Sequence, residues 1–168
     1  MYTKIDDLEQ YGRKNSLRIE GIEISDNETN AILTQKVACT LNSMGAEVTP
    51  SDFFRLHRSG KPHTKGGRRI AQTIVRFTSW AARSRALKTR YFGTSEERKA
   101  RPFFARLDLT KRRLALLNSA QASLVNHPFA HAYADGECGL LITNRDTKEK
   151  HRFNTPQELD SALACIGR

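Results

Sequence analysis

Lysine and arginine side chains that could hold a phosphate backbone gather in two short stretches of this chain. The first covers residues 55–69, where the basic residues are mixed with histidine, proline and glycine. The second is Lys111-Arg112-Arg113, at the start of a predicted helix. Guanidinium and ammonium groups bind phosphate through charge-assisted hydrogen bonds, and a helix N-terminus adds free backbone N–H donors. Both stretches therefore indicate an anionic ligand.

The overall composition agrees with an anionic partner and argues against a membrane protein. The chain has 168 residues with a formal net charge of +10, and 38% of its residues are hydrophobic. That apolar fraction is enough to form a folded core, and the positive charge favours nucleic acid as a ligand. Positive charge also keeps proteins soluble, and the sequence leaves open that the basic residues at 55–69 serve solubility and not binding. No apolar run reaches about eighteen residues, so we expect no membrane-spanning helix.

Residue types that often carry catalysis are present, but their spacing does not suit it. The sequence lacks the GxSxG, HExxH and P-loop motifs. The histidines are scattered without metal-ligand spacing: His57, His63, His127, His131 and His151. We therefore predict a protein that is not an enzyme and that uses neither a metal nor another cofactor.

The hydrophobic pattern predicts an α+β protein in two parts. Strands are expected over residues 17–22, 53–58, 70–78 and 102–107, and helices over residues 28–44 and 79–92. Residues 59–69, with their tandem glycines, are predicted to form a long mobile loop, and residues 94–101 a second loop. The resulting order is β-α-β-β-α-β, an RRM-like, ferredoxin-like domain over residues 13–107. Residues 108–168 then predict a small α-β-β-β-α C-terminal domain, and residues 1–12 a helical lead-in or the end of a coiled coil.

In this order of elements the first and third strands are central, and their outward faces form the binding platform. RNA-recognition motifs usually carry stacking aromatic rings there. This chain has Arg18, Gln72 and Ile74 at those positions, with Arg76 further along the third strand. An arginine can stack on a base or hold a phosphate. The alternative, which the sequence leaves open, is that Arg18 and Arg76 pair with Glu20 on a solvated sheet face.

Other basic side chains are expected to complete the contact. The loop at residues 59–69 would lie beside the sheet and close over a bound strand. Cations in the first turn at Lys111 oppose the helix dipole, which suggests that they have a ligand. The expected nucleic-acid contacts are Arg13, Lys14, Arg18, Arg55, Arg58, Lys61, Lys65, Arg68, Arg69, Arg76, Arg83, Arg85, Lys111, Arg112 and Arg113.

Several motifs, in this order along the chain, resemble one family. "LEQYGRKNSLRIEGI" is similar to the end of the coiled coil and the start of the RNA-recognition motif in first-open-reading-frame proteins of LINE-type retrotransposons (transposase-22-like). "LDLTKRRLALLNSA", "YADGECGLLI" and "FNTPQELDSAL" resemble that family's C-terminal domain. The baculovirus few-polyhedra (FP) proteins are a related family. The resemblance implies RNA contacts at Arg58, at Arg83 or Arg85, and at Arg112 or Arg113.

The resemblance also implies what the protein does. It predicts a noncatalytic nucleic-acid chaperone that coats its retrotransposon transcript in a cytoplasmic or nuclear ribonucleoprotein. It implies a homo-oligomer, a trimer formed through a coiled coil of which this chain keeps at most the last turns. Single-stranded RNA or DNA would run through the cleft between the two domains, held by arginines with weak sequence preference. The alternative is an FP-like protein-interaction or scaffolding module, because the central strands lack rings. A nuclease would need a carboxylate or metal cluster, which the sequence does not show.

Overall fold

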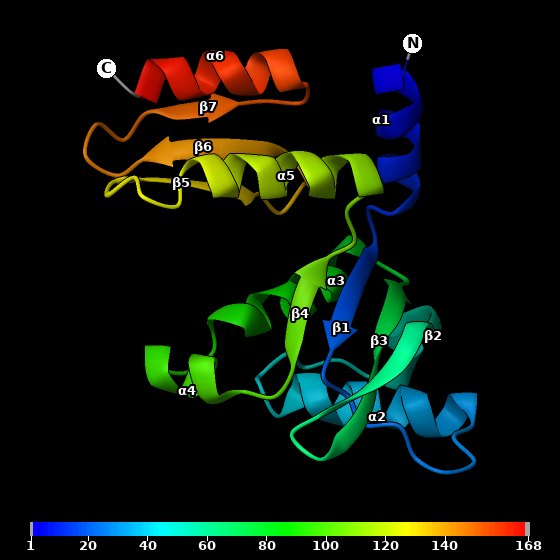
Figure 1. Cartoon of the computed structure of the whole chain (residues 1–168). Coiled ribbons are helices and arrows are strands. Elements are labelled where there is room, and N and C mark those ends of the chain that lie inside the picture. The colour runs from blue at the N-terminus through cyan, green and yellow to red at the C-terminus, as the bar shows by residue number, and fades with distance from the viewer. Residues whose placement is uncertain (1, 167–168) are drawn as a thin grey trace. The chain divides into compact units, whose positions relative to one another are not determined.

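The computed structural model describes residues 2–166 of the chain, which fall into two compact units. The central unit is Asn15–Asp108, and the terminal unit combines Met1–Lys14 with Leu109–Arg168. Each unit contains helices and one antiparallel sheet, so the predicted α+β class is confirmed (Figure 1). The predicted lead-in helix at residues 1–12 corresponds to α1 (Tyr2–Gly12), which belongs to the terminal unit.

The central unit is built on a four-stranded sheet with helices packed on one face (Figure 1). The strand order is β2-β3-β1-β4, and every neighbouring pair is antiparallel. The strands are β1 (Ser16–Glu20), β2 (Phe53–Lys65), β3 (Arg68–Phe77) and β4 (Phe104–Leu107). The helices are α2 (Asn30–Asn42), α3 (Trp80–Lys88) and α4 (Ser95–Ala100), with 3-10 turns η1 (Pro50–Asp52) and η2 (Thr89–Tyr91).

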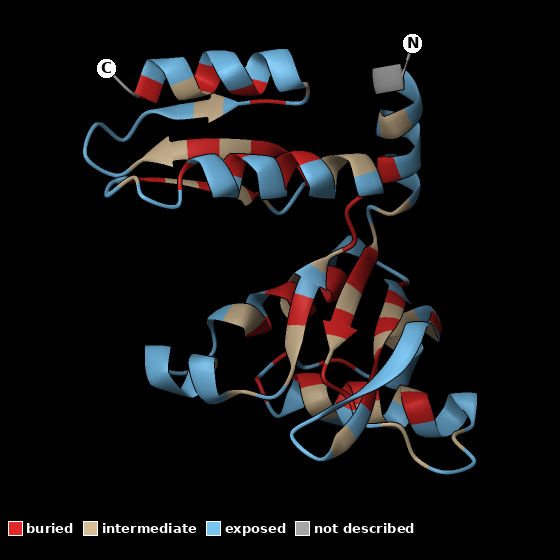
Figure 2. Ribbon diagram, viewed as in Figure 1, coloured by how far each residue is buried: buried red, intermediate tan, exposed pale blue. Residues whose placement is uncertain are grey.

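Side chains alternate across this sheet as the sequence pattern predicts. Leu17 and Ile19 of β1, and Val75 and Phe77 of β3, are buried in the core beneath α2 and α3. The residues between them point to the other face, because successive side chains of a strand alternate. That other face, which α2 and α3 do not cover, is called the outer sheet face below. Figure 2 shows the buried residues alternating along β1.

The prediction of a long mobile loop over residues 59–69 is wrong. β2 continues to Lys65, and β3 returns from Arg68, so the basic stretch forms a hairpin, with a register shift between Ser59 and His63. Its turn is Gly66-Gly67, with φ of 57° and 75°. Two-residue hairpin turns of this type need positive φ at both central residues, which glycine adopts without strain. Lys65, Arg68 and Arg69 therefore occupy cross-strand positions of a hairpin, and Lys61 lies in its irregular segment.

The segment at residues 94–101, predicted as a loop, contains the short helix α4. Its capping box explains the difference. The Thr94 hydroxyl accepts a hydrogen bond from the Glu97 N–H at 3.3 Å, and the Glu97 carboxylate accepts one from the Thr94 N–H at 2.6 Å. Reciprocal bonds of this kind satisfy two of the free N–H groups at a helix start.

The terminal unit has a three-stranded antiparallel sheet of order β5-β6-β7. Its elements are α1 (Tyr2–Gly12), α5 (Lys111–Ser123), β5 (Ala130–Ala134), β6 (Leu140–Asn144), β7 (Lys150–Arg152) and α6 (Pro156–Ile166). Leu116 of α5 and Leu159 of α6 line one common groove, so both helices cover the same face of the sheet. Beneath them Leu140, Ile142 and Phe153 are fully buried. The opposite face of this sheet is covered by neither helix.

Candidate nucleic-acid interface

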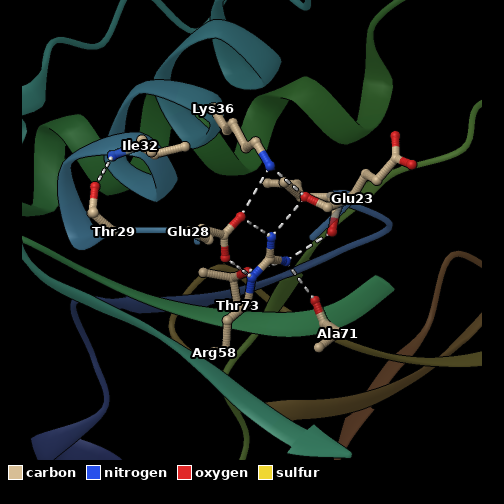
Figure 3. Close-up of polar contacts among 9 residues, drawn as sticks. Glu23, Glu28, Thr29, Ile32, Lys36, Arg58, Ala71 and Thr73 are labelled. Atoms are coloured by element: carbon tan, nitrogen blue, oxygen red, sulfur yellow. Dashed lines mark hydrogen bonds and ion pairs between the residues drawn. The ribbon is translucent and has the colours of Figure 1, made fainter. Parts of the chain in front are cut away.

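Arg58, expected to contact RNA, is held inside the central unit instead (Figure 3). Its guanidinium donates to both carboxylate oxygens of Glu28, each at 2.9 Å. It also donates to the backbone carbonyls of Ile22 at 2.8 Å, Ala71 at 2.9 Å and Glu23 at 2.9 Å. These bonds use all three guanidinium nitrogens, and the side chain is only 18% exposed. Arg58 therefore fastens β2 and β3 to the segment before α2.

The electrostatics of this cluster agree with a structural role for Arg58. Lys36 adds a second cation, 3.0 Å from the Glu28 carboxylate, as Figure 3 shows. The hydrogen bonds from Arg58, and then the bond from Lys36, lower the pKa of Glu28 from 4.5 to about 2, against the opposing effect of burial. Glu28 therefore stays ionised in the folded chain, and its carboxylate offsets one of the two positive charges of Arg58 and Lys36.

Two further arginines of the expected set are internal. Arg83 of α3 is 1% exposed, so no ligand can reach it in this structure. Arg113 pairs with Asp6 at 2.9 Å and Asp7 at 2.6 Å, and it donates to the Cys138 carbonyl at 2.9 Å. The cation in the first turn of α5 thus has a ligand within the protein, the carboxylates of α1. We therefore remove Arg58, Arg83 and Arg113 from the expected contacts.

Arg18, at the position of the missing ring on β1, is also engaged. Its Nε lies 2.7 Å from Asp108, and its Nη1 donates to the Gln72 side chain at 2.8 Å. Gln72 in turn donates to Glu20 at 3.1 Å. A polar network thus crosses the outer sheet face on its central strands. The sequence left open whether Arg18 pairs with Glu20. In the structure its carboxylate partner is Asp108, and the Gln72 side chain links Arg18 to Glu20 by hydrogen bonds.

Three other expected contacts make weaker ion pairs near solvent. Arg13 lies 2.6 Å from Glu9, Lys14 lies 3.2 Å from Glu137, and Arg85 lies 3.7 Å from Asp52. Exposed pairs of this kind contribute little free energy and exchange readily. These side chains remain accessible for a stronger anionic ligand.

Arg55 and Arg76 form the most unusual pair on the outer sheet face. They stand directly opposite each other on β2 and β3, and both are exposed. Neither has an ion pair with any residue that the structure describes. Like charges directly opposite each other destabilise a sheet. An anion placed between these two guanidinium groups would remove the repulsion.

Aromatic rings, which the sequence seemed to lack on this sheet, are present on its edge strands. The Arg76 guanidinium lies over the Phe54 ring, 5.4 Å from the ring centroid. On the other edge Arg106 lies over Phe104 at 5.8 Å. Phe54 is 69% exposed. Each edge therefore offers a ring beside a guanidinium, a combination that stacks bases and binds phosphates. Sequence reasoning missed both rings because each follows another phenylalanine, Phe53 or Phe103, that packs on the core.

The hairpin carries the remaining expected contacts of the central unit. Lys61, Lys65 and Arg69 are exposed, and Arg68 is half-buried. A pocket of about 220 Å³ lies at the base of the hairpin on the outer sheet face. Its lining includes Glu20, His63, Lys65, Gln72 and Phe104. Hairpin and sheet thus both carry basic side chains, and the Phe104 ring lines the pocket at the base of the hairpin.

In the terminal unit, α5 presents Lys111 to solvent and leaves Arg112 partly exposed. Neither makes an ion pair with a residue within the described chain. Of the first-turn cations, these two are accessible for a ligand.

Among residues 2–166 there is no group of three or more histidine, cysteine or acidic side chains arranged to hold a metal ion. No helix in the described part of the chain is both long and apolar enough to cross a membrane. In comparisons with known proteins, no family model matches this chain, and no curated protein is significantly similar to it.

Proposed function

We propose that this chain binds single-stranded nucleic acid, RNA above all, on the outer sheet face and basic hairpin of the central unit. The observation that carries the proposal is the pair Arg55 and Arg76, opposed across β2 and β3 without an acidic partner among the described residues. The exposed Phe54 ring lies beside them. A phosphate between the arginines and a base on the ring would use both features.

The arrangement of strands supports an RRM-like, ferredoxin-like domain. The order of the main elements is β-α-β-β-α-β, with β1 and β3 central in the sheet. Sheets of this kind bind unstacked bases on their open face. In this chain the central strands carry the Arg18–Gln72–Glu20 network, so bases would stack at the edges on Phe54 and Phe104. Because stacking is tolerant of base identity, the proposal includes weak sequence preference.

The family resemblance extends the proposal to a biological role. The chain would coat a retrotransposon transcript in a cytoplasmic or nuclear ribonucleoprotein, as a chaperone that does no chemistry of its own. Phosphate contacts that exchange quickly would let mismatched strands separate and pair again. Ile5, Leu8 and Tyr11 of α1 are 58%, 74% and 76% exposed. Such an apolar stripe supports self-association, a trimer in the resembling family.

The test is a salt titration of RNA binding with variants of the outer sheet face. We expect an unstructured single-stranded RNA to bind with an affinity that falls steeply as salt rises. Each phosphate contact contributes about 0.7 to the slope of the logarithm of affinity against the logarithm of salt. The double variant Arg55→Ala, Arg76→Ala removes the site of one phosphate, so it should bind more weakly and lose about 0.7 from this slope. Fluorescence anisotropy measures both quantities.

Lys99→Ala is the matched control, because Lys99 is exposed on α4 and pairs with Glu96 at 3.0 Å. It should leave the salt slope nearly unchanged. Absence of salt-sensitive binding by the wild-type chain would refute the proposal. A loss in Lys99→Ala of about half that in the double arginine variant, in proportion to the charge removed, would show that net charge, not this surface, binds the RNA.

A second candidate function is a protein-interaction module. The polar network of Arg18, Gln72, Glu20 and Asp108 favours it, because it fills the ring positions of the central strands. This function predicts tight binding to an acidic protein and little binding to oligonucleotides. The salt titration distinguishes the two candidates.

A further inference from the structure

The strand β5 carries an unusual sequence for the open edge of a small sheet. From Phe129 to Ala134 the chain reads "FAHAYA", in which aromatic residues alternate with alanine. The three alanines are buried, 6–8% exposed, on the side of α5. His131 and Tyr133 therefore point to the sheet face that neither α5 nor α6 covers. An open sheet face normally carries polar residues, so aromatic residues there suggest a ligand.

The rings form an ordered row rather than isolated side chains. The His131 and Tyr133 rings are stacked, with centroids 5.4 Å apart and planes 20° apart. Phe129, which continues the alternation, is 48% exposed. Burial and then the charge of Arg145 lower the pKa of His131, so its ring is neutral at pH 7. A row of uncharged rings is suited to stacking with planar groups.

The register of the sheet places a basic residue of β7 in line with the His131 ring and another in line with the Tyr133 ring, two strands away. His131 pairs with Thr143, which pairs with Lys150; Tyr133 pairs with Leu141, which pairs with Arg152. Directly paired residues share a face of the sheet. The open face thus has rings on β5 and cations on β7, two strand spacings or roughly 10 Å away.

The first ring, Phe129, also has a basic residue nearby, and two of the three basic residues near the rings make no ion pair within the described chain. The Arg145 backbone N–H donates to the Phe129 carbonyl at 2.8 Å, and the Arg145 charge acts on the His131 ring. Lys150 and Arg145 have no ion pair with any residue of the described chain, whereas Arg152 lies 3.2 Å from Asp135. Rings on one side and unpaired cations on the other match a ligand with planar bases and a charged backbone.

We propose that the open face of the β5-β6-β7 sheet is a second binding site for single-stranded RNA. Bases stack on Phe129, His131 and Tyr133, and the backbone phosphates lie near Lys150 and Arg145. The inference deepens the proposed function and depends on it, because it adds a site in the terminal unit for the same ligand. It also replaces Arg113, which is bound internally by Asp6 and Asp7, as the main contact of this unit.

The experiment uses the full chain and an unstructured RNA of roughly twenty nucleotides, several times the length that one aromatic platform holds. RNA carrying 5-iodouridine is bound, irradiated and digested, and the crosslinked peptides are identified by mass spectrometry. We expect crosslinks at Phe129, His131 or Tyr133. The double variant His131→Ala, Tyr133→Ala should bind about tenfold more weakly or worse. Its salt slope should equal that of the wild type, because no charge is removed.

Two single variants serve as controls. Tyr133→Phe keeps the ring and should bind like the wild type, which rules out a role for the hydroxyl group. Tyr91→Ala removes a more exposed ring, 64% exposed and outside both open sheet faces, and should also bind like the wild type.

The possible failures are distinguishable. Crosslinks confined to the central unit, with wild-type affinity in His131→Ala, Tyr133→Ala, would overturn this inference and leave the proposed function standing. A wild-type chain that binds no RNA at all would overturn both.

Discussion

Replacing Arg58 with alanine should destabilise the central unit strongly, although the family resemblance places this residue at the RNA. The pKa of Glu28 falls from 4.5 to about 2 in the folded chain, chiefly through Arg58. That shift corresponds to about 3 kcal/mol of favourable interaction for a side chain that is 9% exposed. The substitution also leaves the carbonyls of Ile22 and Ala71 without this donor. We therefore expect the free energy of unfolding to fall by about 3–5 kcal/mol.

The effect has a defined dependence on pH. The folded-state pKa of Glu28 is depressed, so the stabilisation is fully present above pH 4.5 and is lost as the pH falls toward about 2. The difference in free energy of unfolding between the wild type and Glu28→Gln should shrink across this window. Above pH 4.5 Glu28 is ionised in the folded and the unfolded chain alike, so its titration should not change this difference further.

Urea unfolding followed by tryptophan fluorescence measures these changes, because the single tryptophan, Trp80, lies in α3 of the same unit. Arg55→Ala is the matched control on the same strand: Arg55 is exposed and has no ion pair with the described residues. It should change the free energy of unfolding by less than about 0.5 kcal/mol while weakening RNA binding. The reasoning is refuted if Arg58→Ala keeps the wild-type urea midpoint and loses RNA affinity as Arg55→Ala does.

Two further substitutions test other parts of the structure by amide hydrogen exchange. Arg113→Ala removes the ion pairs to Asp6 and Asp7, so the amides of α1 should lose protection by about 2–4 kcal/mol, whereas Lys111→Ala should leave them unchanged. Gly67→Val places a branched side chain at φ 75°, at a cost of about 1–2 kcal/mol. Amides near the tip of the β2-β3 hairpin should then exchange faster, and unchanged exchange there would contradict the two-glycine turn.

The core of the central unit could be predicted from the sequence because alternation of side chains is a local property. Leu17, Ile19, Val75 and Phe77, which alternate with the residues expected on the outward face, are buried in the core. The hairpin was missed for a different reason. Tandem glycines permit both a mobile loop and a tight turn, and the strand pairing on either side, which is not a local property, decides between them.

The aromatic residues show a second limit of sequence patterns. In "FF", one ring must face the core and the other solvent, but the pair alone does not say which. Phe53 and Phe103 pack on the core, and Phe54 and Phe104 follow them on the edge strands. The alternation of ring and alanine at residues 129–134 was, by contrast, readable: small residues toward a helix leave the rings on the open face.

Buried carboxylates explain why the roles of the arginines could not be predicted. Glu28, Asp108 and Asp6 hold Arg58, Arg18 and Arg113, at sequence separations of 30, 90 and 107 residues. A sequence gives the number of acidic and basic groups, but folding decides which of them meet.

An arginine that meets a buried carboxylate has its charge neutralised, and moving it to a phosphate would leave that carboxylate unpaired at a cost of several kcal/mol. The net charge of +10 is therefore a poor guide to the number of phosphate contacts. Cations that lack such a partner among the described residues, as Arg55 and Arg76 do, are the ones an RNA backbone can engage without breaking the fold. The salt dependence of binding should follow these accessible cations, not the total of 28 lysine and arginine residues.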